Sequence, residues 1–232
     1  MKRSVEAIVL GAAISLVPAM AVAHISITSG PGFANATQTI KFGVGHGCEG
    51  LDTYMIKIDI PAGVTSVRPM PSDFGKLSVE ADATGAVKSV TWTRTDQETL
   101  PADQAYYELS VRAKLPNQSF TIVYFPTHQY CKSEDGGIVV SDWIGTDPAD
   151  TTVEPAPAVA MVPARRPGWN KFTMPAAIAD ITTSSYFADA LIVWKGNAAF
   201  SPSPATTDLI KSTAGVTALT ALSANDEVWV KY

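Results

Sequence analysis

The strongest candidates for metal chemistry in this sequence are its three histidines and two cysteines. His24 directly follows Ala21-Val22-Ala23, the small-residue pattern at which a signal peptidase cleaves. Cleavage there makes His24 the first residue of the mature chain, so one residue offers a free α-amino group and an imidazole nitrogen. The two donors can chelate one metal ion as the half-unit of a histidine brace, and such nitrogen donors favour Cu(II). The alternative is that His24 follows the cleavage site by chance.

Residues 1–23 have the three parts of a secretory signal. Two basic residues open the segment, an apolar run extends from Ala7 to Val22, and the Ala-x-Ala pattern ends it. The run is shorter than the roughly 20 apolar residues of a membrane helix, and Pro18 interrupts it. We therefore predict a cleaved signal peptide and a periplasmic or secreted protein that has no membrane span after cleavage.

The predicted mature chain is acidic. Residues 1–23 hold two of the 17 basic and one of the 22 acidic residues, so the formal net charge without them is −6. An acidic balance argues against nucleic acid or an anionic membrane as the main partner. The sequence also has neither a G-x-S-x-G hydrolase motif nor a phosphate-binding loop.

A copper site needs further ligands, and an anion among them offsets the charge of the ion. In residues 105–113 the odd positions are apolar, so Glu108 points to the opposite face of the predicted strand. In HISIT, Ile25 and Ile27 face the core, which turns His24 outward as well. The pattern places both side chains outside the core without showing that they meet, and a solvated glutamate is the alternative.

The other two histidines lie beside the cysteines, as His46-x-Cys48 and His128-x-x-Cys131. Four such residues can form a closed tetrahedral zinc site. Outside the cytoplasm thiolates compete poorly with disulfide formation, so we predict a Cys48–Cys131 disulfide instead. This bridge removes the thiolate that a blue-copper centre requires. It would also bring His46 and His128 into one neighbourhood, as a secondary metal site or simply as hydrogen-bonding side chains.

The hydrophobic pattern from residue 24 to 146 has period two, in short runs separated by turn residues. The runs are HISIT, TQTIKFGV, TYMIKIDIP, GKLSVEAD, AVKSVTWTRT, YYELSVRAKL, SFTIVYFP and GGIVVSDWIG. Short β-rich runs at this spacing predict an antiparallel β-sandwich or barrel.

The composition changes twice after the predicted sandwich. Residues 147–168 contain five prolines, which is typical of a linker or a surface segment, with AVAMV as one further edge strand. Residues 169–232 contain strand-like runs and TTDLIKSTAGVTALTAL, which favours a short helix capped by Thr206 or Thr207. Because this part is small for an independent core, we expect a C-terminal β-rich extension packed on the sandwich.

Several stretches match, in order, the motifs of one known family. FGVGHGCEGLDTYMIKIDIPAGV is similar to its His-Gly-Cys segment and the strand that follows. YYELSVRAKLP, TIVYFPTHQYC and GGIVVSDWIG are similar to its next three blocks, and EPAPAVAMVP to its Pro-rich end. Over roughly residues 24–163 the sequence thus resembles the YcnI-like (DUF1775) family of exported copper-binding proteins. One departure is Gly50-Leu51-Asp52-Thr53, where the family commonly has Gly-Ser-Pro-Thr.

The resemblance implies a cupredoxin-like or immunoglobulin-like β-sandwich that binds Cu(II) through a single-histidine brace. By position, the amine and imidazole belong to His24, the carboxylate ligand to Glu108, and the indole beside the metal to Trp143. The carboxylate would partly neutralise the ion, and the indole would shield one side of it through a cation–π contact. Packing in the core or at a sheet edge is the alternative role of Trp143.

These observations favour a periplasmic Cu(II)-binding protein for copper delivery, storage or acquisition, and not an enzyme. Its partners would be the copper ion and a membrane copper transporter or another periplasmic copper chaperone. One alternative is a copper-dependent oxidative enzyme of the lytic monooxygenase kind, in which His46 or His128 completes a two-histidine brace. The other is a non-catalytic adhesion or assembly module that binds no metal tightly, with His24 incidental.

Overall fold

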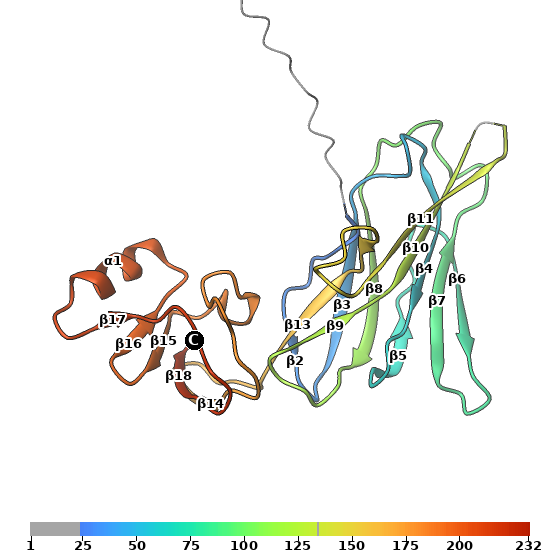
Figure 1. Ribbon diagram of the computed structural model, residues 1–232. Helices are drawn as coiled ribbons and strands as arrows, with labels where there is room; N and C mark the ends of the chain where they lie inside the picture. The colour runs from blue at the N-terminus through green and yellow to red at the C-terminus, as the bar shows by residue number, and fades with distance from the viewer. Residues whose placement is uncertain (1–23, 134) are drawn as a thin grey trace, which may run out of the picture.

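Two β-rich lobes make up the computed structural model, which describes residues 24–133 and 135–232 (Figure 1). The predicted signal peptide, residues 1–23, lies outside the described residues. In Figure 1 the larger lobe is coloured from blue to gold, and the smaller lobe, orange to red, follows it in the chain. None of the helices in the described part of the chain is long and apolar enough to cross a membrane.

The larger lobe is a β-sandwich. A four-stranded sheet, β1-β3-β8-β5, packs on a six-stranded sheet, β12-β11-β10-β4-β7-β6, and a three-stranded sheet, β2-β13-β9, completes it. All strand pairs are antiparallel except β11–β12 and β2–β13. The strands are β1 (Ser26–Ile27), β2 (Gly32–Phe33), β3 (Thr37–Val44), β4 (Thr53–Asp59), β5 (Thr65–Pro69), β6 (Lys76–Ala81), β7 (Val87–Thr93), β8 (Tyr107–Lys114), β9 (Thr121–Tyr124), β10 (Thr127–Lys132), β11 (Ile138–Gly145), β12 (Glu154–Pro155) and β13 (Ala158–Val162).

The period-two pattern of the sequence explains how the sandwich core forms. Successive side chains of a strand point to opposite faces, so every second residue of each strand enters the space between the sheets. The fully buried side chains of this core include Ile40, Phe42, Ile56, Ile58, Trp92, Leu109, Val111 and Phe125. The prediction of an all-β antiparallel sandwich is thereby confirmed.

Two strands of the larger lobe come from the Pro-rich segment 147–168. β12 lies along the edge of the six-stranded sheet, beside β11. β13 contains AVAMV, but it lies between β2 and β9 and not at a sheet edge as the sequence suggested. Its side chains Val159, Met161 and Val162 are buried, which explains why this run of small and apolar residues forms a central strand.

The smaller lobe has a sheet and a hydrophobic core of its own. Its five-stranded sheet has the order β14-β18-β15-β16-β17, and its core contains Met174, Ile181, Phe187, Val193, Val228 and Val230. The elements are β14 (Trp169–Thr173), the 3-10 helix η1 (Ser185–Phe187), β15 (Ile192–Lys195), β16 (Ala198–Phe200), α1 (Pro204–Ser212), β17 (Thr217–Ala218) and β18 (Glu227–Lys231).

Helix α1 begins one turn earlier than the sequence suggested. Ser203 is its N-cap and Pro204 takes the first helical position, where a missing N–H costs nothing and the fixed φ of proline suits the helix. Thr206 and Thr207, the expected caps, therefore lie inside the helix. The hydroxyl of Thr207 instead donates to the carbonyl oxygen of Ser201, 3.0 Å away.

Aromatic and cation–π contacts join the two lobes. Phe120, which precedes β9, belongs to the core of the smaller lobe, where its ring centroid is 5.8 Å from that of Phe187. The Arg165 guanidinium lies 4.0 Å from the ring centroid of Tyr232 in the smaller lobe and 5.1 Å from that of Phe33 in the larger one. Phe120 of the larger lobe thus packs in the smaller one, and Arg165, between β13 and β14, contacts both lobes.

The predicted disulfide between Cys48 and Cys131 is present, so this prediction from the sequence is confirmed. Their Cα atoms are 5.7 Å apart, and the bond closes a sequence separation of 83 residues. On the chain-entropy model such a loop closure stabilises the folded state by about 4 kcal/mol. Neither cysteine sulfur remains for a zinc or blue-copper site.

A buried ion pair explains the aspartate at the point where the sequence departs from the YcnI-like pattern. The Asp52 side chain is fully buried and accepts hydrogen bonds from Arg94 (2.6 Å), the Tyr107 hydroxyl (2.7 Å) and the Leu100 backbone N–H (2.8 Å). The Arg94 guanidinium also lies 5.4 Å from the Phe74 ring centroid and 5.1 Å from that of Tyr107. Burial, reinforced by the Asp52 carboxylate, raises the pKa of Tyr107 to about 12.

Replacing Asp52 by asparagine should lower the free energy of unfolding by about 3–5 kcal/mol, because Arg94 then keeps its charge in the core without a counter-ion. Urea denaturation of the two proteins measures the difference. Asp96→Asn is the matched control, since Asp96 pairs with Lys132 at the surface and its side chain is 75% exposed. The control should change stability by no more than about 0.5 kcal/mol. Equal losses in both variants would contradict the structural role of the buried pair.

Candidate metal centre

His24 lies beside Trp143 and Glu154 at the start of the described chain. The ring centroids of His24 and Trp143 are 5.4 Å apart, with an interplanar angle of 55°. His24 Nε2 is 3.5 Å from Glu154 Oε2. In Figure 1 the blue start of the chain lies next to the gold segment that contains β12. Three segments that are distant in the sequence therefore meet at this point.

Strand pairing positions these three residues. β12 runs parallel to β11, and Glu154 of β12 is paired with Trp143 of β11. This pairing places the Glu154 carboxylate next to the strand that contains Trp143. Ile25 is buried in the sandwich core and anchors the chain just after His24. The His24 side chain remains 41% exposed, and that of Glu154 52% exposed, so solvent and ions reach both.

A buried amide holds the indole of Trp143 in place. Trp143 is almost fully buried, and its Nε1–H donates to Gln129 Oε1 at 3.1 Å. The amide nitrogen of Gln129 donates in turn to the His46 carbonyl (2.6 Å) and to Thr53 Oγ1 (2.7 Å). Because the amide is buried and uses both its oxygen and its nitrogen, it fixes the orientation of the indole against the core.

Glu108 is exposed on the outer face of β8, as the alternation predicted, but its carboxylate contacts other partners. It accepts from Lys41 Nζ at 2.9 Å and from Thr28 Oγ1 at 3.2 Å. The hydrogen bond from Lys41, helped by that from Thr28, holds the pKa of Glu108 below its usual range. Gly43 of β3 pairs with Ser26 on one side and with Glu108 on the other, so these three residues lie in one line across the sheet. Thr28 and Lys41 lie on the far side of this line from His24, so the Glu108 carboxylate is directed away from His24.

The other two histidines lie on different sides of the six-stranded sheet, although the disulfide is formed. The His46 ring packs against the buried Trp143 with a centroid distance of 6.5 Å. His128 points to the outer face of β10, where Nδ1 is 2.6 Å from Asp142 Oδ1 and Nε2 is 3.3 Å from Asp59 Oδ2. The bridge does not bring the two histidines into one site. Successive residues of a strand point to opposite faces, so His128 points outward while Gln129 and Cys131 of the same strand point inward, toward the side where His46 lies.

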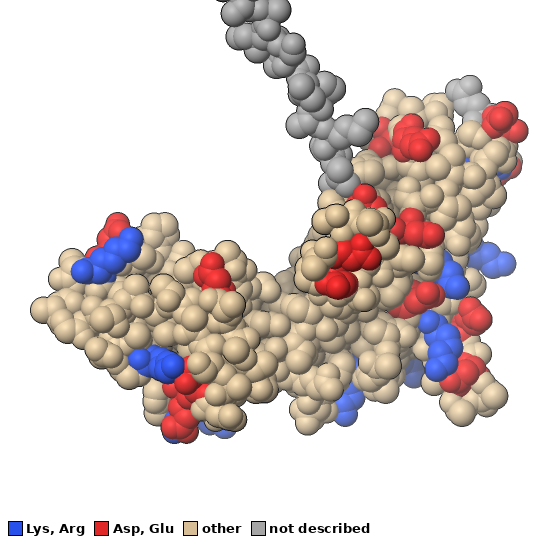
Figure 2. Space-filling model, in the orientation of Figure 1, with Lys and Arg blue, Asp and Glu red and all other residues tan. Residues whose placement is uncertain are grey.

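The chain segment that leads into Glu154 is acidic. The loop between β11 and β12 carries Asp147 and Asp150, β12 begins with Glu154, and residues 146–154 include no lysine or arginine. Figure 2 shows acidic side chains gathered over this part of the larger lobe. Such a field attracts cations. Within residues 24–133 and 135–232, no three or more histidine, cysteine, aspartate and glutamate side chains are grouped to hold a metal ion by themselves.

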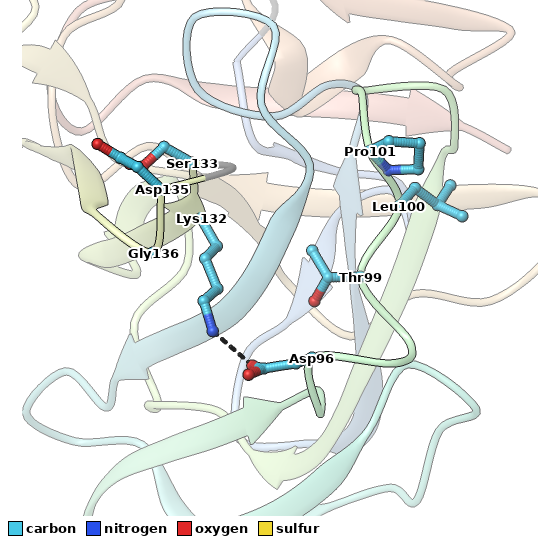
Figure 3. A pocket seen from close by; sticks show the side chains of 8 residues that line it. All are labelled: Asp96, Thr99, Leu100, Pro101, Lys132, Ser133, Asp135 and Gly136. Carbon is cyan, nitrogen blue, oxygen red and sulfur yellow. Dashed lines mark hydrogen bonds and ion pairs between the residues drawn. The ribbon is translucent and has the colours of Figure 1, made fainter.

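A separate surface cleft lies at the other end of the β10–β11 hairpin (Figure 3). It is lined by Asp96, Thr99, Leu100, Pro101, Lys132, Ser133, Asp135 and Gly136. Lys132 Nζ and Asp96 Oδ1 are 2.5 Å apart across it, so its two charged walls already neutralise each other. The described residues of the cleft offer no imidazole, and we assign it no part in metal binding.

Residues 24–161 match the family described as "Domain of unknown function (DUF1775)". The chain belongs to the DUF1775 family. The match begins at His24 and includes Trp143 and Glu154, so the whole neighbourhood of the candidate site lies inside the family domain. The search of curated proteins found no match to the chain.

Solved structures similar to the chain are distant from it. One is the crystal structure of an uncharacterized Nocardia farcinica protein with an immunoglobulin-like fold. It is 23% identical, the match spans 60% of this chain and 98% of the Nocardia chain, and the TM-score is 0.49. A cohesin module of a Clostridium perfringens family 33 glycoside hydrolase is 11% identical over 61% of this chain and 96% of its own, with a TM-score of 0.34. The major pilin subunit BcpA of Bacillus cereus is 9% identical over 89% of this chain and 54% of its own, with a TM-score of 0.36. The fold assignment therefore rests on the strand order described above.

Sequence reasoning missed two residues of the site. Glu154 lies in a Pro-rich stretch whose sequence does not indicate that it forms a short strand paired with β11. Gln129 had a usable signal, because it is two positions from Cys131 in one strand and so shares the buried face of that cysteine. A polar residue on such a face is expected to bind other buried polar groups.

Replacing Gln129 by leucine should lower the free energy of unfolding by about 2–3 kcal/mol, because the Trp143 N–H and the His46 carbonyl lose their partner inside the protein. Urea denaturation measures the loss, and the near-ultraviolet circular dichroism of the folded variant reports the changed setting of the indole. Gln97→Leu, at an exposed position, serves as the control and should leave both readouts unchanged. A Gln129→Leu protein as stable as the wild type would show that the amide does not support Trp143.

Proposed function

We propose that this chain is an exported protein that binds Cu(II) at the N-terminus created by cleavage before His24. Its role would be copper delivery, storage or acquisition in the periplasm or outside the cell. The observation that carries the proposal is the meeting of His24 with Trp143 and Glu154 at the point where the mature chain would begin. The disulfide, which is typical of exported proteins, agrees with this compartment.

The orientation of the His24 ring suits a brace. A metal-bound histidine usually donates its other ring N–H to a carboxylate, which fixes the tautomer and the plane of the ring. Nε2 of His24 faces Glu154, and in the proposed brace Nδ1 would be the ring nitrogen that binds the metal. The α-amino group of the same residue then completes the chelate, because it is attached two carbons from the ring.

Two glutamates are candidates for the acidic partner of the site. Glu108, which the family resemblance suggested, would have to leave Lys41 before it could approach a metal at His24. Glu154 already lies beside the imidazole and has no lysine or arginine partner among the ion pairs of the described residues. We therefore assign the acidic role to Glu154, either as a ligand or through the His24 ring.

The donors determine when copper would bind and leave. Amine, imidazole and carboxylate are nitrogen and oxygen donors that suit Cu(II) better than Cu(I), so reduction would favour transfer to a softer acceptor. A membrane copper transporter or another periplasmic copper chaperone would be such an acceptor. The amine has a reference pKa of about 8 and must lose its proton to bind, so affinity should fall on acidification.

Mature protein whose first residue is His24 should bind one Cu(II) tightly, with nitrogen hyperfine splitting in its EPR spectrum. Adding one alanine before His24 turns the amine into an amide and removes the chelate, so Cu(II) affinity should fall by about 100-fold or more. Isothermal titration and EPR at pH 7.5 measure both effects, after mass spectrometry has verified each N-terminus. Unchanged binding by the extended protein would place the metal elsewhere, for example at His46 or His128.

Glu154→Gln in the mature protein should weaken Cu(II) binding by about 10- to 100-fold, the usual effect of removing a carboxylate that orients a metal-bound histidine. Glu108→Gln is the matched control and should change the affinity by less than about threefold, because its carboxylate is directed to Lys41. Competition titration against a chelator of known affinity resolves the two. The reverse ranking would transfer the acidic role to Glu108.

A further inference from the structure

Three tryptophans lie together on the outward face of the smaller lobe. Trp169, Trp194 and Trp229, together with Gly196, line a shallow groove on the five-stranded sheet. Trp169 is 50% exposed and Trp229 49% exposed. Tryptophan is usually well buried, and a group of exposed aromatic rings commonly marks a binding surface.

Strand pairing holds these rings side by side. They come from β14, β18 and β15, which are consecutive neighbours in the sheet. Trp229 pairs directly with Trp194 on one side, and on the other side Trp169 lies diagonally from it, two positions along β14. Because neighbouring strands are about 4.8 Å apart, the three rings extend over about 10 Å across the sheet. The alternate residues of β18, Val228 and Val230, are fully buried and keep the central strand rigid.

Charged side chains border the rings. Lys171 pairs with Trp229 across the strands, and its Nζ is 2.6 Å from Glu227 Oε1. Lys231 Nζ lies 6.0 Å from the ring centroid of Trp169. The border thus supplies both hydrogen-bond donors and an acceptor, next to three apolar ring faces.

The three indole rings and the charged residues around them indicate which class of ligand this surface would bind. A cationic ligand is disfavoured, because the Lys231 ammonium already lies near the face of Trp169. An anionic polymer or anionic membrane gains little, since Glu227 neutralises Lys171. The rings also lie on strands between charged residues, which prevents them from entering a bilayer as a group. What remains is a neutral ligand that has flat apolar faces and hydroxyl groups at its edges.

We propose that the surface formed by Trp169, Trp194 and Trp229 binds a neutral polysaccharide built of pyranose rings. The C–H groups of a sugar face carry partial positive charge and pack on the negative face of an indole. The hydroxyl groups at the sugar edge would accept from Lys171 and donate to Glu227. This inference does not depend on the proposed copper site, which lies in the other lobe.

The test uses the full mature chain without copper and three neutral hexasaccharides, of β-1,4-linked glucose, β-1,4-linked N-acetylglucosamine and β-1,4-linked mannose. Isothermal titration should detect binding of at least one, and tryptophan fluorescence should change with it. Trp229→Ala and Trp194→Ala should each weaken that binding by about tenfold or more, as truncation of an aromatic anchor does. Trp229→Phe, which keeps a ring, should lose less.

Leu209→Ala is the matched control, because Leu209 is a 64% exposed apolar residue of the same lobe that lies on α1. Its affinity for the hexasaccharide should equal that of the wild type, and thermal unfolding checks that each variant is folded. The proposal is overturned if no hexasaccharide binds, or if the tryptophan variants bind as well as the wild type. It is also overturned if the tryptophans are required only for binding to phosphatidylglycerol vesicles or to a proline-rich peptide.

Discussion

The buried amide of Gln129 is the interaction on which the candidate site depends. It lies on β10, the strand between β4 and β11 in the six-stranded sheet, and binds Trp143 on one side and the His46 backbone on the other. Two positions along β10, Cys131 is bonded to Cys48, so the segment that contains His46 is attached to the same strand twice. The indole beside His24 is therefore positioned by the core of the sandwich and not by a flexible surface loop.

The sequence patterns predicted those features of the structure that depend on residues close together in the chain. Alternation gave the strands and the outward direction of His24 and Glu108, and the compartment argument gave the disulfide. Alternation cannot tell which exposed side chains meet, because that depends on register between strands. Glu108 thus points outward as predicted but contacts Lys41, whereas Glu154 reaches His24 through a parallel pairing that a Pro-rich sequence does not signal.

Asp52 illustrates the same limit inside the core. In the sequence it was a departure from the family pattern with no role. In the structure its carboxylate is buried because Arg94, 42 positions away, lies between two aromatic rings and reaches it. A buried carboxylate is costly unless such a partner is present, so the pair must form together with the fold. Only the packing of β4, β7 and β8 brings the two residues into contact.

The two proposed binding sites lie in different lobes. Most of the candidate copper site is preformed, since strand pairing and Gln129 place Trp143 and Glu154 whether or not the α-amino group is free. Proteolytic processing would then add the one missing donor to a finished fold, which makes copper affinity a property of the exported form alone. The smaller lobe has a core separate from that of the sandwich, so a ligand on its aromatic surface would leave the packing of the sandwich core unchanged. If both proposals hold, attachment of the smaller lobe to a glycan would keep the proposed copper site of the larger lobe close to that glycan.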